Sequence, residues 1–318
     1  MKKKVNKRNI IFWCAIAVFF VSVGVIVVEF YGSLKSKSNF EDLRALIDEE
    51  QMTPESTTAP AETDEETSTN LISSETETST TPALSEKETS TESSEEKEST
   101  SEIITTPEET VQEPKTVLKK YAKLYKLNNN MIGWIRINGT VIDYPVLWLE
   151  GDNDYYLEHN FYNEKSKYGQ IILDSRCDFE TPSTNLIFHG HHMADGTMFG
   201  SLRRYQKESY YNKHKYIQFD TIYEEGTYEI FAVFLSKIYN KDDKVFKYYN
   251  FIDAATEEAF DTYVAAVKTL SLYETGIIPE YGDELIALST CEYSQDNGRL
   301  VVVARRLSPE EVEKLSKK

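Results

Sequence analysis

One segment of this chain is unable to form a hydrophobic core, so a folded domain can form only outside that segment. From Thr53 to Lys115 the residues are mainly Ser, Thr and Glu, and seventeen carboxylates are set against three lysines. Such a composition buries too little apolar surface to offset the conformational entropy lost on ordering. We therefore expect residues 31–115 to form an acidic disordered linker, with a short helix over Asn39–Gln51 ahead of its acidic part.

The charge of the chain is concentrated in the same segment. The whole sequence carries a formal net charge of −18, of which Thr53–Lys115 contributes −14 and all other residues −4. Proteins that bind nucleic acids neutralise phosphates with clustered Lys and Arg. The sequence has more acidic than basic residues, so it does not indicate nucleic-acid binding.

The N-terminus has the pattern of a membrane-spanning segment. A basic flank, Lys2 to Arg8, precedes the uncharged run Asn9–Val28, which ends at Glu29. As a helix, Ile10–Val28 would be about 28 Å long, close to the hydrocarbon thickness of about 30 Å. Because a basic flank stays in the cytoplasm, we expect residues 1–30 to be a single-pass anchor in the cell membrane, with the rest extracellular. A cleaved signal peptide is the alternative, although the apolar run is longer than a usual signal core.

Residues 116–318 have the composition of one folded domain. Tyr, Ile, Val and Leu become frequent at about Thr116, and about two hundred residues suffice for a substantial core. Apolar residues at helical spacing predict one helix beginning near Val117 and a longer one over Ala255–Leu270. Ser308-Pro309-Glu310-Glu311 is a capping box with Pro at the first helical position, which predicts a short C-terminal helix.

Strand-like runs dominate the rest of this domain. Asn138-Gly139 between two apolar runs predicts a hairpin with a tight type I′ turn. The expected strands are Trp134–Ile137, Thr140–Ile142, Gly169–Leu173, Asn185–Phe188, Lys215–Phe219, Thr227–Ser236, Glu284–Thr290 and Arg299–Arg305. These runs predict a mainly β fold, a closed or nearly closed barrel of roughly eight strands with helical additions.

Three residue types in the domain suit covalent acyl transfer. Cys291 ends one apolar run, Arg299 opens the next, and His189-Gly190-His191-His192 lies about a hundred residues upstream. A thiol supplies a nucleophile, an imidazole moves protons and a guanidinium stabilises negative charge. An antiparallel return would bring Arg299 beside Cys291, where a cation favours the thiolate.

Two other interpretations of Cys291 stay open. The residue is also a candidate for a buried core cysteine, in which case Arg299 is a surface cation. A disulfide with Cys177 would silence the thiol, whereas Cys14 lies within the expected membrane segment.

The segments around these residues resemble a known family. Leu288-Ser289-Thr290-Cys291-Glu292-Tyr293, followed by Gly298–Arg305, resembles the active-site signature of class B sortases, the membrane-anchored cysteine transpeptidases of Gram-positive bacteria. Gly190–Met193 with Asp195–Phe199 resembles the histidine loop of that family. The resemblance extends from Thr116 to about Leu307 and implies a sortase-like β-barrel.

The resemblance implies roles for the matching positions. Cys291 would be the nucleophile, His191 the general acid and base, and Arg299 the clamp on the oxyanion or substrate. The residues implied for substrate binding are Ser289, Asn153, Leu157 and Glu292, the last through its backbone N–H as a second oxyanion donor. The family usually has Tyr two residues before the catalytic histidine, where this chain has His189.

The resemblance also implies a reaction and its partners. The enzyme would cleave a C-terminal sorting signal of a secreted protein through a thioester, which an amine of a lipid-linked peptidoglycan precursor, or a pilin lysine, would open. Neither a cofactor nor a metal is implied. The alternatives are a thiol protease that uses water, a non-enzymatic surface binding module, and a zinc hydrolase built on His189, His191, His192 and Asp195.

Overall fold

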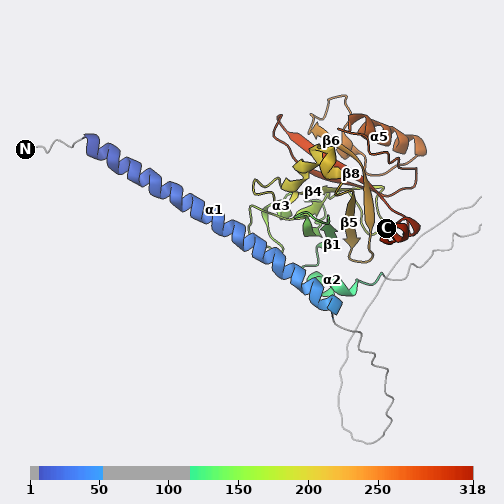
Figure 1. Cartoon of the computed structure of the whole chain (residues 1–318), viewed down its shortest axis with the longest axis horizontal. Coiled ribbons are helices and arrows are strands. Elements are labelled where there is room, and N and C mark those ends of the chain that lie inside the picture. The colour runs from blue at the N-terminus through green and yellow to red at the C-terminus, as the bar shows by residue number, and fades with distance from the viewer. Residues whose placement is uncertain (1–6, 53–114, 318) are drawn as a thin grey trace, which may run out of the picture. The chain divides into compact units, whose positions relative to one another are not determined.

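The computed structural model describes residues 7–52 and 115–317. They belong to one compact unit, which contains the N-terminal helix α1 (Lys7–Met52) and the whole C-terminal domain. The end of α1, in blue, lies beside α2 (Lys119–Leu127), in green (Figure 1). The acidic part of the expected linker, residues 53–114, lies outside the described residues.

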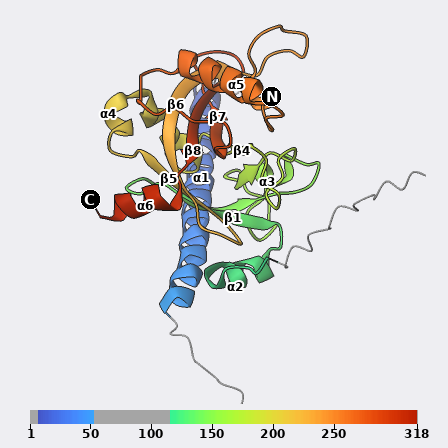
Figure 2. The same ribbon diagram turned by 90° about the vertical axis from the view of Figure 1, so that its right-hand side faces the viewer.

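Eight strands close into a barrel, which confirms the predicted fold class. Around the barrel the order is β1-β2-β3-β4-β7-β8-β6-β5, and β5 returns to pair with β1. The long strands β6 and β8 run side by side (Figure 2). The bounds are β1 (Met131–Arg136), β2 (Asp143–Leu147), β3 (Ile171–Leu173), β4 (Asn185–His189), β5 (Tyr216–Thr221), β6 (Thr227–Lys237), β7 (Leu285–Cys291) and β8 (Gly298–Arg306).

The first hairpin forms where the sequence predicts it, but with a different turn. Thr140 N–H donates to the Ile137 carbonyl at 3.1 Å, and of the two central residues only Gly139 has positive φ, at 74°. A type I′ turn needs positive φ at both central residues, so this turn has the pattern of type II. The second strand consequently begins at Asp143, after the predicted run Thr140–Ile142.

The longer helices of the domain match the sequence patterns. α5 (Glu257–Leu270) begins after Thr256, whose side chain accepts from Ala259 N–H. α6 (Pro309–Ser316) has the complete capping box between Ser308 and Glu311. Four short elements were not predicted, because segments of three to eight residues show too little periodicity. They are α3 (Tyr155–Glu158), the 3₁₀ helix η1 (Phe199–Gln206), α4 (Glu208–Tyr211) and the 3₁₀ helix η2 (Tyr248–Asn250).

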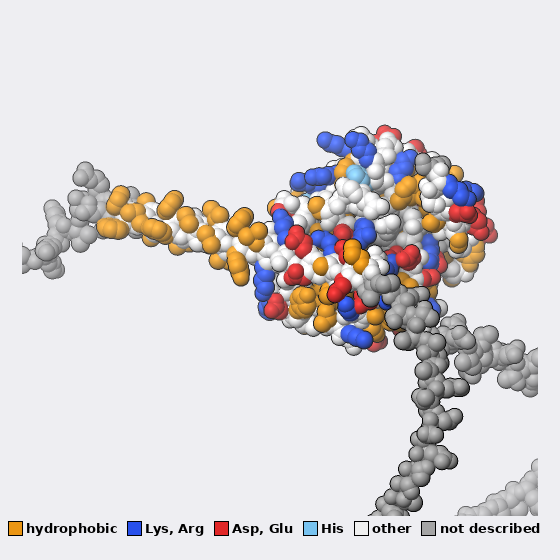
Figure 3. All heavy atoms as spheres, turned by 60° about the horizontal axis from the view of Figure 1, so that its bottom comes forward, with side chains coloured by type: hydrophobic (Ala, Val, Ile, Leu, Met, Phe, Trp, Pro, Cys, Tyr) orange, Lys and Arg blue, Asp and Glu red, His pale blue; other side chains and the backbone are white. Residues whose placement is uncertain are grey.

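The N-terminal half of α1 is apolar and exposed. Within the described residues it belongs to the one helix long and apolar enough to cross a membrane, and Phe19, Phe20 and Val28 are each more than 60% exposed. Figure 3 shows the apolar side chains in orange along this helix. By length and composition, this segment is either a membrane anchor or a signal sequence.

The C-terminal half of α1 corrects the expected linker boundary. Residues 31–52 are helical rather than part of a linker, and the separate short helix expected over Asn39–Gln51 is the end of the same helix. Phe40, Leu43 and Ile47, spaced along one helix face, are at most 5% exposed and join the core. Burial of this stripe accounts for the ordering of the segment.

Truncating this stripe should destabilise the domain. Leu43→Ala removes a fully buried side chain, so we expect the free energy of unfolding to fall by about 2–5 kcal/mol. Leu34→Ala on the same helix is the control, because Leu34 is 51% exposed and should change little. Urea unfolding of the full chain in detergent measures both, and equal effects would contradict the packing role of α1.

Candidate active site

Three neighbouring strands bring the predicted catalytic residues to one edge of the barrel. β4 and β7 are parallel, with His189 opposite Ser289, and β7 and β8 are antiparallel, with Cys291 opposite Arg299. Directly opposed residues have Cβ atoms about 4.5–5.5 Å apart on one face. His191 follows β4 by two residues, in a loop whose next residue, His192, contacts the Cys291 carbonyl. Cys291 and Arg299 therefore lie side by side on β7 and β8, and the loop after β4 brings His191 to the same edge of the barrel.

Cys291 is a free, half-buried thiol at the end of β7. Cys177 is also free and only 2% exposed, so these two described cysteines do not form the disulfide left open by the sequence. Burial raises the pKa of the Cys177 thiol to about 12, which keeps that thiol protonated and inert. Cys291 is thus the accessible thiol of the pair.

His191 follows a glycine that close packing requires. A Cβ on Gly190 would lie 2.6 Å from the Ile171 side chain and 2.8 Å from the Phe199 ring. The Gly190 carbonyl accepts a buried hydrogen bond from Thr290 Oγ1 at 2.8 Å, which ties the residue before His191 to the residue before Cys291. These contacts fix where the histidine loop leaves β4.

The imidazole of His191 is oriented by a backbone carbonyl. Its Nε2 lies 2.8 Å from the Leu157 carbonyl oxygen. Because a carbonyl only accepts, Nε2 must carry the proton, and the lone pair of the neutral ring is on Nδ1. Leu157, expected in the substrate groove, therefore holds the histidine through its backbone, while its side chain packs against the core.

Arg299 presents a guanidinium that pairs with no carboxylate among the described residues. Its Nη1 donates to the Gly298 carbonyl at 2.9 Å, and the side chain is partly exposed. Since a guanidinium has five N–H donors, most of them remain for an oxyanion or a substrate carbonyl.

The other residues expected to bind substrate are engaged within the protein. Ser289 is 2% exposed, and its hydroxyl lies 2.7 Å from the Tyr248 hydroxyl oxygen. The Glu292 N–H, expected to be an oxyanion donor, donates to the Gly298 carbonyl at 2.9 Å. Asn153 Oδ1 accepts from Ser175 N–H at 2.7 Å. A substrate would reach the Ser289 hydroxyl or the Glu292 N–H only if these bonds rearranged.

The histidine-rich turn does not form a metal site. No group of three His, Cys, Asp or Glu side chains able to hold a metal occurs in the described residues. His189 contacts Asp174, His191 contacts the Leu157 carbonyl, and His192 contacts the Cys291 carbonyl. Asp195 instead accepts from Thr197. The four groups of the zinc alternative thus have separate partners.

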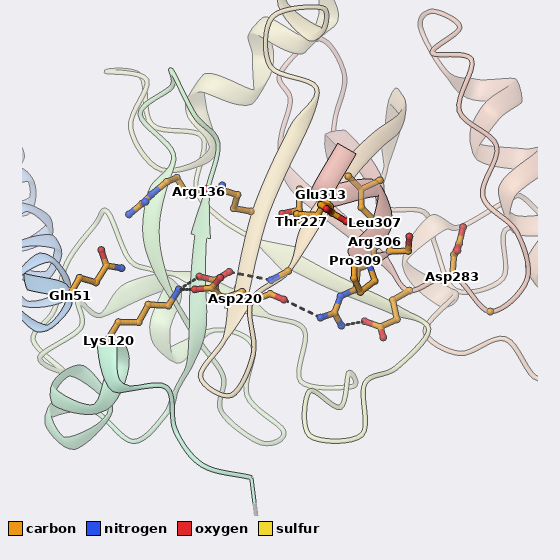
Figure 4. A pocket seen from close by; sticks show the side chains of 17 residues that line it. Gln51, Lys120, Arg136, Asp220, Thr227, Asp283, Arg306, Leu307, Pro309 and Glu313 are labelled. Carbon is orange, nitrogen blue, oxygen red and sulfur yellow. Dashed lines mark hydrogen bonds and ion pairs between the residues drawn. The ribbon is translucent and has the colours of Figure 1, made fainter. Parts of the chain in front are cut away.

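A large cavity lies away from these residues. It has a volume of about 890 Å³, and none of Cys291, His191 and Arg299 lines it. Its charges are largely paired. Lys120 lies 2.8 Å from Asp220, and Arg306 lies 2.8 Å from Glu284. Figure 4 shows the Lys120–Asp220 pair. Because these charges neutralise one another, the cavity does not alter the assignment of the candidate site to the edge of β4, β7 and β8.

Comparison with known proteins places this arrangement in a family. A family model described as the sortase domain matches residues 135–307. Sortase B of Staphylococcus aureus is 34% identical over 191 residues, which are 59% of this chain and 75% of that protein. Sortase B of Listeria monocytogenes is 36% identical over 181 residues, 56% of this chain and 70% of that protein. The chain belongs to the sortase family.

Solved structures agree with this membership. The Staphylococcus aureus sortase B–substrate complex has a TM-score of 0.54 and 31% identity to the chain, over 61% of this chain and 87% of that one. The chain is thus a class B sortase, and the expected enzyme type, a cysteine transpeptidase, is confirmed. This enzyme type differs from both the zinc hydrolase and the non-enzymatic binding module.

A polar cluster around His189 was not predicted from the sequence of this sortase. Asp174 is 3% exposed, and it accepts from His189 Nε2 at 3.0 Å and from Arg176 through two bonds of 2.8 Å. Burial alone would raise the pKa of Asp174, but the hydrogen bonds from Arg176 and His189 outweigh burial and hold that pKa well below its usual range. His189 therefore has an acidic partner, which the sequence offered no motif to identify.

This depressed pKa predicts how the stability of the sortase depends on pH. Asp174 binds its proton more weakly folded than unfolded, so its contribution is complete above the unfolded pKa of about 3.9 and is lost as pH falls below it. Asp174→Asn should lower the free energy of unfolding by about 1–3 kcal/mol at pH 7 and by less at pH 3. Urea unfolding at the two pH values measures this, and an equal loss at both would contradict the prediction.

Proposed function

We propose that this sortase cleaves a C-terminal sorting signal of a secreted protein and transfers the acyl fragment to an amine. The amine would belong to a lipid-linked peptidoglycan precursor or to a pilin lysine. The observation that carries the proposal is the pairing of Cys291 with Arg299 on β7 and β8 of a sortase barrel, with the histidine loop that follows β4 tied to the same edge. In this proposal His191, Cys291 and Arg299 are the proton carrier, the nucleophile and the charge stabiliser.

The first half-reaction breaks the peptide bond. The Cys291 thiolate attacks the scissile carbonyl carbon, and the resulting oxyanion lies against the guanidinium of Arg299. His191, which has taken the thiol proton on Nδ1, donates this proton to the leaving nitrogen as the C–N bond breaks. The products are a free amine and a thioester between the acyl fragment and Cys291.

The second half-reaction forms a new amide. The acceptor amine attacks the thioester carbonyl, His191 takes the proton that the amine loses, and the C–S bond breaks to restore the thiolate. A solved sortase B structure in complex with triglycine supports a glycine-type amine as acceptor. The apolar half of α1 supports a membrane anchor, which would hold the enzyme on the outer face of the membrane, where substrate and precursor meet.

The choice between amine and water is open to a direct experiment. The full chain is incubated with a library of sorting-signal peptides, with and without triglycine, and the products are identified by mass spectrometry. We expect peptide–triglycine conjugates to exceed hydrolysed peptide when triglycine is present. Hydrolysed peptide alone at every triglycine concentration would contradict transpeptidation and favour a thiol protease. The full chain is used because α1 contributes Phe40, Leu43 and Ile47 to the core.

A further inference from the structure

The side chain of a second histidine contacts the backbone of the nucleophilic residue. His192 Nδ1 lies 2.7 Å from the carbonyl oxygen of Cys291. Since the carbonyl can only accept, Nδ1 is the donor and carries a proton whether the ring is neutral or charged. The bond joins the histidine loop directly to the residue that bears the reactive sulfur.

The position of this bond explains why a side chain is needed there. Backbone groups of alternate residues in a strand face the same neighbour, so the carbonyls of Ser289 and Cys291 both face β4. The Ser289 carbonyl accepts from Gly190 N–H at 3.3 Å, whereas β4 ends at His189 and leaves no strand opposite Cys291. The imidazole of His192 thus supplies the donor that a longer β4 would have supplied.

The loop that carries His192 is itself anchored from two other elements. His192 forms an isolated β-bridge with Met198, whose N–H donates to the Tyr144 hydroxyl at 3.1 Å. Met198 is fully buried and adopts φ of 51°, an uncommon conformation for a residue with a side chain. The Tyr144 ring packs on Phe40 of α1, with ring centroids 4.8 Å apart. A continuous series of contacts therefore connects α1, through β2, to the carbonyl of Cys291.

We propose that His192 is a positioning residue that fixes the backbone of Cys291 by donating Nδ1–H to its carbonyl. The proposal rests on the catalytic role proposed for Cys291. His192 fixes the Cys291–Glu292 peptide, and with it the direction in which the sulfur leaves the strand end. Loss of the donor would let the nucleophile shift, and misplacement of a reacting group by about 1 Å can cost about 10²-fold in rate.

Three substitutions at His192 separate the donor from the ring. In His192→Asn the side-chain amide nitrogen occupies nearly the position of Nδ1, whereas in His192→Gln it lies farther out, near the position of Nε2. We expect His192→Ala and His192→Gln to lower kcat by about 10- to 100-fold with KM changed by less than about threefold. His192→Asn should retain kcat within about threefold of the wild type.

The matched control is a histidine that makes the same bond far from the site. His214 Nδ1 lies 2.9 Å from the carbonyl of Asn138, in the β1–β2 turn, so His214→Ala removes an equivalent bond and should leave kcat unchanged. The readout is transpeptidation by the full chain of the peptide that the library selects, with triglycine as acceptor, alongside thermal unfolding of each variant. If His192→Ala fails to fold, the comparison of His192→Asn with His192→Gln still tests the positioning role.

Wild-type kcat in His192→Gln, or a loss in His192→Asn as large as in His192→Gln, would overturn the positioning role. The proposed function would fail in a different way: the wild type would form no peptide–triglycine conjugate, or Cys291→Ala would retain activity. The two proposals can therefore fail separately.

Discussion

Cys291→Ala is expected to abolish peptide cleavage and transfer while leaving the fold intact. Alanine cannot form the thioester, so the rate should fall by at least about 10⁴-fold. The barrel should be unaffected, because Cys291 is a half-buried residue at the end of β7 and its strand pairing is made by the backbone. Product formation, measured by chromatography, and circular dichroism of the same sample test the two parts of the prediction.

The matched control for this variant is the second described cysteine of the domain. Cys177 is buried, and burial raises its thiol pKa to about 12, so Cys177→Ala should keep its activity at temperatures where it is folded. Activity in Cys291→Ala close to that of the wild type would remove the nucleophile from the proposed mechanism. Loss of activity in a folded Cys177→Ala would show that the proposed mechanism names the wrong cysteine as the nucleophile.

Arg299→Lys should lower turnover by about 10²-fold although the positive charge is kept. An ammonium is a point charge on a flexible stem, whereas the guanidinium is a planar group with several fixed donors. Arg299 already donates from Nη1 to Gly298, and the lysine cannot keep that contact and face the oxyanion with the same geometry. Steady-state kinetics should show the loss mainly in kcat, because the oxyanion exists only in the transition state and intermediate.

Arg203→Lys is the control for this second variant. Arg203 is an exposed residue of η1 and is not one of the proposed catalytic residues, so turnover should be unchanged. Wild-type kcat in Arg299→Lys would show that charge alone is sufficient at this position. A large rise in KM with unchanged kcat would instead make Arg299 a ground-state binding residue.

The sequence predicted the barrel and the Cys291–Arg299 pairing because both depend on local patterns. Apolar runs of strand length end at Cys291 and begin near Arg299, and an antiparallel return between them sets the register. The capping box at Ser308 was likewise visible, since all its groups lie within four residues. These features need no knowledge of distant neighbours.

The features that escaped prediction depend on contacts between distant segments. The stripe of Phe40, Leu43 and Ile47 continues an apolar helix, so nothing in the sequence marked it as a docking face for the barrel. His192 donates to a backbone carbonyl ninety-nine positions away, and a backbone partner leaves no motif. Its position beside His191 was the only signal.

The central claim is that acyl transfer passes through a thioester on Cys291. The most direct test mixes the full chain with the selected sorting-signal peptide in the absence of any added amine and measures the intact protein mass. We expect a mass increase equal to the acyl fragment, located on Cys291 by peptide mapping and removed by hydroxylamine. Peptide cleavage that continues without such an adduct, or with an adduct on another residue, would contradict the claim.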